Sequence, residues 1–302
     1  MKTVTNVTIK LAPGERETMQ ESDLMDRLPE GAGASAVDVA TEHIRLVSLG
    51  NDCGPKLSFK HLGRGAETLP FDWSRTRMEG LLHFMRNDFD GFFSFVTKEP
   101  VPGINGMVSY RDYLHSFWHD DPRDPGMQER YCRRIDRFRS IDAERQMVLF
   151  VRGAMLTSEL SQAEELLADL QKRFGRQAHL LIVLSQQTLA RGPGVIKAAS
   201  NLMVHFLEPG AHNNDGFAVY AESIRVALDW MVGRPVDAMV FPDVAYVQNV
   251  ATEMSHGLTG LGGLPGFEEQ PDAAPSAEAV DTAIARSVAR EREAAAAKAK
   301  QG

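Results

Sequence analysis

Between residues 43 and 256, short apolar runs alternate with stretches of helical periodicity. The apolar runs are rich in Val, Ile, Leu and Phe, as expected for strands that are buried on both faces of a sheet. They cover residues 43–49, 146–152, 179–185, 201–207 and 236–241. Apolar residues recur at helical spacing over 158–174 and 215–231. This alternation predicts an α/β fold, with a mostly parallel sheet covered by helices in Rossmann-like layers.

The two ends of the chain lack this periodicity. Residues 1–42 mix Thr, Glu, Gly and Ala and are expected to form an irregular N-terminal arm. Glycines gather in residues 257–266, which is typical of a flexible linker, and the sequence beyond is rich in Ala and Glu. We therefore expect one α/β domain over residues 43–256, followed over 257–302 by a linker and a low-complexity tail with one marginal helix.

Composition narrows the range of functions. The 302 residues include 33 Lys and Arg against 41 Asp and Glu, a formal net charge of −8. A negative field argues against general binding to nucleic acid or to anionic membranes. No apolar stretch approaches the roughly 18 residues of a membrane span, and the first ten residues lack the apolar core of a signal peptide. We expect a cytoplasmic protein without membrane insertion, whose two cysteines, Cys53 and Cys132, are reduced.

A glycine-flanked cysteine follows the first predicted strand, in the sequence Ser48-Leu-Gly-Asn-Asp-Cys-Gly-Pro. Open α/β sheets bind ligands at the carboxyl ends of their strands. Gly50 and Gly54 permit unusual backbone angles, and a helix that begins near Pro55 would lower the pKa of a thiol at its N-terminus. These features favour Cys53 as a nucleophile. The alternative, which carries equal weight, is an inert buried cysteine.

A thiol nucleophile needs a base, and the base needs a group that orients it. His119 is the candidate base, and Asp72 or Asp120 would hold its ring. Asp72 lies between two aromatic residues, so it is either an anchor bonded to backbone N–H groups or a site residue. The sequence His119-Asp-Asp-Pro is also compatible with an exposed acidic turn. A metal site at His115, His119 and Asp120 lacks any recognised ligand spacing, so we expect no metal and no other cofactor.

An arginine-rich helix is predicted over residues 128–141. Its arginines are more typical of a solvated helix face. In the functional alternative, an anionic group of the substrate is bound by Arg133, Arg134 and Arg137 together with Trp73. Asp243 and Asn249 follow the last predicted strand, and they are further candidates for the orienting role if that strand is parallel to the first.

Taken in order, several blocks of this sequence resemble an uncharacterised bacterial domain family labelled "putative papain-like cysteine peptidases". The blocks are Ser48–Cys53, Pro70–Trp73, the phenylalanine-rich run 89–95, Phe117–Asp120, the arginine-rich helix and the strand 148–152. The resemblance extends over roughly residues 43–245. It implies a Cys-His-acid site at Cys53, His119 and either Asp72 or Asp120, and it also admits a role linked to surface polysaccharides.

The sequence thus predicts a thiol-dependent hydrolase or acyl transferase that acts on an unknown peptide, acyl or glycan-related substrate. Cys53 would attack a carbonyl carbon, His119 would transfer the proton, and backbone N–H groups of the turn formed by Asn51, Asp52 and Gly54 would stabilise the oxyanion. We expect the Cys53 and His119 side chains within about 4 Å of each other. The alternative is a non-catalytic α/β module that binds an anionic sugar or a nucleotide-like ligand. The oligomeric state is not predictable from the sequence.

Overall fold

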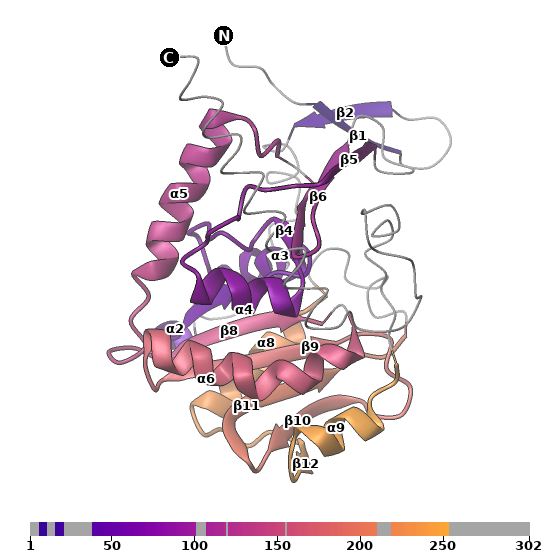
Figure 1. Cartoon of the computed structure of the whole chain (residues 1–302). Coiled ribbons are helices and arrows are strands. Elements are labelled where there is room, and N and C mark those ends of the chain that lie inside the picture. The colour runs from indigo at the N-terminus through magenta and orange to yellow at the C-terminus, as the bar shows by residue number, and fades with distance from the viewer. Residues whose placement is uncertain are drawn as a thin grey trace.

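The computed structural model describes residues 6–10, 16–20, 38–100, 107–118, 120–154, 156–209 and 219–253. The described part is an α/β fold with a six-stranded sheet, a four-stranded sheet and a separate pair of strands (Figure 1). The strands are β1 (Asn6–Lys10), β2 (Arg16–Gln20), β3 (Arg45–Ser48), β4 (Ser74–Thr76), β5 (Thr97–Pro100), β6 (Val108–Arg111), β7 (His115–Phe117), β8 (Val148–Gly153), β9 (Ala178–Leu184), β10 (Gly192–Ile196), β11 (Ala199–Phe206) and β12 (Met239–Phe241). The helices are α2 (Val39–Glu42), α3 (Gly54–His61), α4 (Met78–Arg86), α5 (Pro125–Arg139), the 3₁₀ helix η1 (Thr157–Gln162), α6 (Ala163–Phe174), α8 (Ala221–Met231) and α9 (Val244–Val250).

The six-stranded sheet has the order β12-β10-β11-β9-β8-β3. β3, β8, β9 and β11 are parallel to one another, whereas β10 runs antiparallel to β11 and β12 runs parallel to β10. The expected α/β fold is confirmed, with a mixed sheet that is mostly parallel. The carboxyl ends of β3, β8, β9 and β11 therefore meet at one edge of the sheet, where β3 leads into the segment that contains Cys53.

The direction of β12 corrects one expectation about the site. Because β12 runs opposite to β3, its carboxyl end lies at the other edge of the sheet from Cys53. Asp243 and Asn249 follow β12, so they are not placed to orient a base beside Cys53. Asp243 instead caps α9, where its Oδ1 accepts a hydrogen bond of 2.8 Å from the backbone N–H of Tyr246.

Apolar residues on both faces of the sheet explain why its strands read as continuous hydrophobic runs. Successive side chains of a strand point to opposite faces, so each strand contributes to two cores. One core includes α3 and α8, and the other includes α4, α5, α6 and α9 (Figure 1). Residues that face α3 and α8 include Leu46, Leu149, Leu181 and Met203, while Val47, Phe150, Ile182 and Val204 face the other core.

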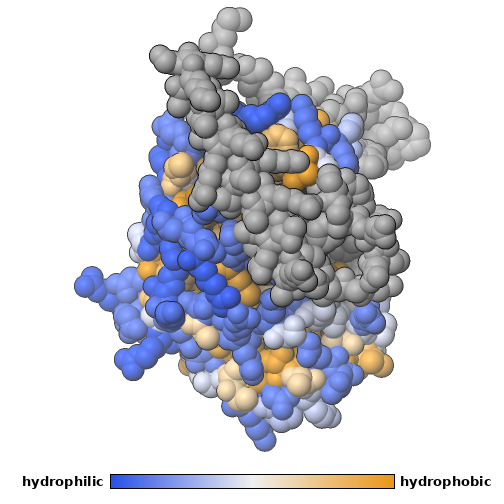
Figure 2. Space-filling view, viewed as in Figure 1, coloured by the Kyte–Doolittle hydropathy of each residue, from blue (hydrophilic) through white to orange (hydrophobic). Residues whose placement is uncertain are grey.

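The four-stranded sheet, with the order β4-β7-β6-β5, is entirely antiparallel and was not expected from the sequence. An aromatic cluster packs against it. Phe92 lies 5.1 Å from Phe84 and 5.5 Å from Phe117 between ring centroids, and Phe71 lies 5.5 Å from Phe138 on α5. The outward side of α5 is mostly hydrophilic (Figure 2). The phenylalanine-rich part of the sequence thus builds the core between this sheet and its helices.

The ends of the chain are described only in part. Within the N-terminal arm, which we expected to be irregular, β1 and β2 pair in antiparallel fashion and α2 forms a short helix. The predicted linker and tail over residues 257–302 lie outside the described residues. Among the described residues, no helix has the length and apolar character needed to cross a membrane.

Candidate active site

Cys53 occupies the N-cap position of α3, at the end of a sharp turn that follows β3. Gly50 and Asn51 both adopt left-handed backbone angles, with φ of 75° and 99°. A Cβ on Gly50 would lie 2.9 Å from the carbonyl oxygen of Phe71, and one on Gly54 would lie 2.8 Å from Oδ1 of Asp52. The turn therefore requires both glycines, as the sequence indicated.

The surroundings of the Cys53 thiol disfavour its ionised form. The side chain is partly buried. Burial and the negative charge of Asp52 raise the pKa of the thiol to about 11, against weaker lowering effects from a backbone hydrogen bond and from Arg75. The expectation that the helix N-terminus lowers this pKa is therefore wrong for these surroundings, because desolvation and a neighbouring carboxylate outweigh it. A thiolate at neutral pH needs a further base.

The carboxylate of Asp52 is bound within the turn. Its Oδ1 accepts a hydrogen bond of 2.7 Å from the backbone N–H of Gly54, and its Oδ2 accepts one of 3.5 Å from the hydroxyl of Tyr220. A Cβ on Gly153, at the end of β8, would lie 2.7 Å from the Tyr220 hydroxyl and 2.8 Å from Nδ2 of Asn51. The Asp52 side chain thus ties the turn to Tyr220 at the start of α8, and the Asn51 side chain lies close to Gly153 at the end of β8. In this conformation the Gly54 N–H is already engaged by Asp52 and is not free to stabilise an oxyanion.

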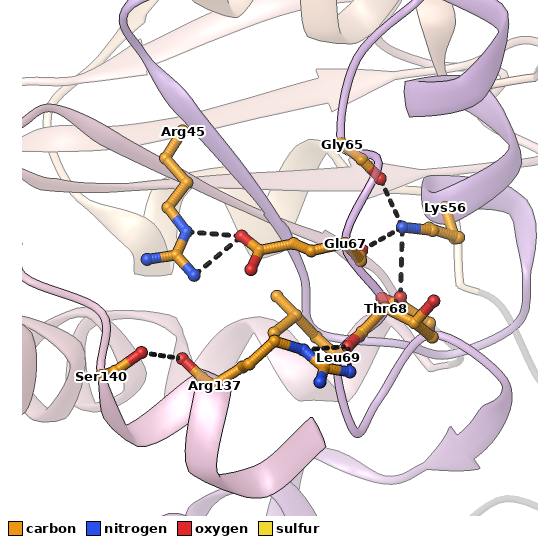
Figure 3. A network of polar contacts seen from close by, with 9 residues as sticks. Arg45, Lys56, Gly65, Glu67, Thr68, Leu69, Arg137 and Ser140 are labelled. Carbon is orange, nitrogen blue, oxygen red and sulfur yellow. Dashed lines mark hydrogen bonds and ion pairs between the residues drawn. The ribbon is translucent and has the colours of Figure 1, made fainter. Parts of the chain in front are cut away.

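Asp72 has the contacts of a structural anchor, one of its two expected roles. Its side chain is buried, and its Oδ2 accepts a hydrogen bond of 2.9 Å from the backbone N–H of Leu69 and lies 3.5 Å from Nζ of Lys56. Lys56, on α3, also donates to the carbonyls of Gly65, at 2.5 Å, and Glu67 (Figure 3). Burial raises the pKa of the Asp72 carboxyl to about 6, although Lys56 lowers it. This pair fixes α3, and with it Cys53, to the chain that leads into β4.

His119 lies outside the described residues, so its predicted distance from Cys53 stays a prediction. The neighbouring Asp120 is described and is bound to α5. Its Oδ1 accepts a hydrogen bond of 2.8 Å from Arg130, and its Oδ2 accepts one of 3.3 Å from the hydroxyl of Tyr131. Asp120 is therefore held firmly rather than exposed in a free acidic turn.

His115 belongs to the core of the four-stranded sheet. Its ring is fully buried and lies 4.8 Å from Phe84, 5.1 Å from Phe92 and 4.8 Å from Phe117 between ring centroids. Burial and, to a lesser degree, His83 lower the pKa of His115 to about 3. Its imidazole is thus neutral at physiological pH. Among the described residues, no group of His, Cys, Asp and Glu side chains is arranged to hold a metal ion.

The arginines of α5 differ in their contacts. Arg133 is exposed and pairs with Glu129 one turn away, at 2.6 Å. The guanidinium carbon of Arg134 lies 4.4 Å from the centre of the Tyr131 ring. Arg137 donates two hydrogen bonds, of 2.6 and 3.1 Å, to the carbonyl of Thr68 (Figure 3). The guanidinium of Arg137 is therefore a structural partner of the chain before β4, and substrate binding by these arginines stays a prediction. Trp73, the fourth predicted substrate-binding residue, is partly buried beside Asp72.

Sequence reasoning missed the importance of Arg152, which is completely buried in β8. Its guanidinium donates hydrogen bonds to the carbonyls of Leu49, at 3.1 Å, and Thr76, at 2.8 Å, and it forms an ion pair of 2.8 Å with Glu159. It thereby ties the residue before the Cys53 turn to β4. The available signal was a lone arginine in an otherwise apolar strand.

A second missed group lies on the four-stranded sheet. The indole ring of Trp118, directly after β7, lies 4.1 Å from the guanidinium carbon of Arg75 and 5.3 Å from that of Arg111, measured to its centroid. The indole N–H donates a hydrogen bond of 2.8 Å to Oγ of Ser116. Arg75 is the weakest of the influences on the pKa of the Cys53 thiol, which it lowers, after burial, Asp52 and a backbone hydrogen bond. The strand of Arg75 also adjoins the Cys53 turn, because a Cβ on Gly50 would lie 3.2 Å from the carbonyl oxygen of Ser74.

Comparison with known proteins supports the family resemblance. Residues 44–187, which run from just before β3 to just after β9, match a family described as "putative papain-like cysteine peptidase". A protein of Acanthamoeba polyphaga mimivirus that is described as uncharacterised is 29% identical over 151 residues, which cover 40% of this chain and 68% of the viral protein. No solved structure matches the chain. The resemblance is therefore confirmed over residues 44–187, and the relative named above is viral, so the bacterial origin expected for the family stays a prediction.

Proposed function

We propose, from the match of residues 44–187 to the papain-like cysteine peptidase family, that this protein is a thiol-dependent hydrolase or acyl transferase with Cys53 as nucleophile and His119 as base. The observation that carries the proposal is that the Cys53 turn adjoins β4, since a Cβ on Gly50 would lie 3.2 Å from the carbonyl oxygen of Ser74. The next residue, Arg75, packs 4.1 Å from the Trp118 ring, and residue 119 follows Trp118 directly. These contacts support a position of His119 near the Cys53 turn.

The raised pKa of the thiol makes a base essential to the proposed reaction. Cys53 loses its proton to His119 as its sulfur attacks the carbonyl carbon of the substrate. His119 then gives that proton to the leaving group, and a thioester forms on Cys53. Water, with His119 as base, attacks the thioester, which releases the acid and restores the thiol. In a transferase, an alcohol or amine takes the place of water.

Asp120 is the better candidate to orient His119. The Asp72 carboxylate is buried and engaged by Lys56 and by the Leu69 N–H. Asp120 is adjacent to His119 in sequence, and it is held by Arg130 and Tyr131 in a fixed position. A carboxylate has about four lone-pair sites, so it has capacity for a further bond to an imidazole N–H.

The second candidate is a non-catalytic module that binds an anionic ligand. Two observations favour it: the Cys53 pKa of about 11, and the engagement of the Gly54 N–H by Asp52. In that case Cys53 is a packing residue. For either function, we propose a cytoplasmic location with reduced thiols and no binding to nucleic acid. The proposed substrate of the enzyme is a peptide, acyl or glycan-related compound, and the proposed ligand of the non-catalytic module is an anionic sugar or a nucleotide-like compound.

An activated ester separates these two functions without knowledge of the natural substrate. With p-nitrophenyl acetate, we expect a rapid release of p-nitrophenolate equivalent to one acetyl group per chain, followed by slower turnover. Mass spectrometry of the quenched reaction should find the acetyl group on Cys53. Cys53→Ser and His119→Ala should each abolish the rapid phase, whereas Cys132→Ser should retain it. A rapid phase that persists in Cys53→Ser would refute the thiol mechanism.

A further inference from the structure

Two arginines lie in one row across the four-stranded sheet. Arg75 on β4 is directly opposite Ser116 on β7, and Ser116 is directly opposite Arg111 on β6. Directly opposed residues of antiparallel strands place their side chains on the same face of the sheet. The two guanidinium groups therefore flank the Ser116 hydroxyl on one face.

Trp118 lies on this same face, because it follows Ser116 by two positions. Its ring is the surface on which both guanidinium groups stack, at 4.1 Å for Arg75 and 5.3 Å for Arg111. Its indole N–H is held by Ser116 Oγ. The arrangement fixes the positions of two positive charges through aromatic contacts, and such a contact leaves the N–H donors of Arg75 available to another group.

The two arginines of this cluster differ in their partners. Burial and the charge of Arg75 lower the pKa of Arg111, while Glu99 raises it, so Glu99 is its partial counter-charge. Arg111 is buried, and its Nε also donates to Ser109 Oγ. Arg75 is partly buried, and within the described residues it has neither an ion pair nor a hydrogen bond. Guanidinium groups in such a position are stabilised by a bound carboxylate or phosphate, with which they form paired, charge-assisted hydrogen bonds.

The cluster adjoins the Cys53 turn. A Cβ on Gly50 would lie 3.2 Å from the carbonyl oxygen of Ser74, the residue before Arg75. The turn also carries the negative charge of Asp52. That carboxylate accepts hydrogen bonds from the Gly54 N–H and from the hydroxyl of Tyr220, which lies at the start of α8. Arg75 therefore belongs to a strand that adjoins the turn, whereas Asp52 belongs to the turn itself.

We propose that Arg75, assisted by Arg111, binds a carboxylate or phosphate group of the substrate beside Cys53. The substrate is then an acyl compound with an anionic group close to the bond that is cleaved. The anion site is inferred from the geometry of the four-stranded sheet. That the bound anion is part of a substrate rests on the proposed thiol function.

Iodoacetate and iodoacetamide test the site with the protein as it exists. Both reagents form an S–C bond with a thiolate and release iodide, but only iodoacetate carries a carboxylate. Cys132, which is exposed on α5, serves as a reference thiol in the same chain. At low ionic strength, the ratio of the iodoacetate rate to the iodoacetamide rate should be about tenfold higher at Cys53 than at Cys132, the lower end of electrostatic focusing. Site-resolved mass spectrometry measures both ratios.

Variants test whether Arg75 causes the preference of Cys53 for iodoacetate. Arg75→Gln should reduce the Cys53 ratio to that of Cys132 or below, and Arg75→Lys should retain part of it. Arg145→Gln removes the same charge from a side chain that is 89% exposed and should leave the ratio unchanged. Protection of Cys53 by acetate more than by inorganic phosphate would indicate a carboxylate ligand, and the reverse order would indicate a phosphate ligand.

The outcomes separate the two proposals. A reactive Cys53 without any preference for iodoacetate, or with a preference that Arg75→Gln leaves intact, would overturn the anion site and leave the thiol function standing. If Cys53 reacts with neither reagent, the thiol function fails, and the anion site is then judged by the fluorescence change on titration with inorganic phosphate and with acetate. A change with either anion that is absent in Trp118→Phe and in Arg75→Gln would support the site, and no change with either would overturn it.

Discussion

Arg152 and Glu159 form a completely buried ion pair, 2.8 Å long, at the carboxyl end of β8. The same guanidinium also donates to the carbonyls of Leu49 and Thr76, so one side chain holds β3, β4 and η1 together. Leu49 directly precedes Gly50, where the Cys53 turn begins. Arg152 is therefore a positioning residue that fixes the turn relative to the four-stranded sheet.

Arg152→Met should destabilise the fold strongly, because it leaves the Glu159 carboxylate buried without its partner and two carbonyls without donors. Removal of one member of a buried pair typically costs about 3–5 kcal/mol, whereas replacement of both members by apolar residues costs much less. The free energy of unfolding, measured in denaturant, should thus recover in part in the double variant Arg152→Met with Glu159→Leu. A change below about 1 kcal/mol in Arg152→Met would contradict the positioning role.

Asp52→Asn should make Cys53 more acidic. The substitution removes the charge that raises the thiol pKa, while the amide oxygen still accepts a hydrogen bond from Gly54. The pH dependence of iodoacetamide alkylation should therefore shift to lower pH at Cys53 and stay fixed at Cys132. An unchanged inflection at Cys53 would show that the charge of Asp52 does not raise this pKa.

His115 should make stability depend on pH. Its pKa is about 3 in the folded protein against 6.5 as the ordinary value, so between these pH values the unfolded chain binds the additional proton. The free energy of unfolding should therefore fall as pH drops below 6.5, by up to about 1.4 kcal/mol per pH unit from this residue. His115→Phe or His115→Leu should remove that part of the slope between pH 4 and 6.5. Equal slopes in the wild type and both variants would contradict the buried neutral imidazole.

Arg137 and Arg133 provide a matched pair on one helix. Arg137→Ala should lower the free energy of unfolding by about 1.5–3 kcal/mol, since it removes charged donors from the Thr68 carbonyl. Arg133→Ala, which removes only an exposed pair with Glu129, should change it by less than about 1 kcal/mol. Thermal and chemical denaturation of both variants measure this contrast, and equal effects would refute it.

The central strands were predictable because their apolar runs are nearly continuous, as in β8 and β9. β10 was not predictable, because Gly192-Pro-Gly consists of residues that strands usually exclude. In the structure, this segment is a strand because it pairs with β11 and β12. β4 and β7 contain only three residues each, too few to show an alternating pattern. The antiparallel sheet was therefore recognisable only from the pairing of its strands in the structure.

The candidate site was predictable where local sequence determines it. The glycines around Cys53 mark a turn whose backbone angles need them, and Asp72 between aromatic residues marked a carboxylate that needs donors. The partners themselves were not predictable. Lys56 meets Asp72, and Arg75 meets Trp118, only because helix and strands that are distant in sequence pack together.

The most direct test of the account is the pH profile of Cys53 alkylation by iodoacetamide, in a Cys132→Ser background, with and without His119. If His119 takes the thiol proton during the attack, Cys53 should react at neutral pH, far below the thiol pKa of about 11 that burial and Asp52 impose, and His119→Ala should remove this reaction at neutral pH. Equal rates at neutral pH with and without His119 would contradict the account, because Cys53 and His119 would then not act together.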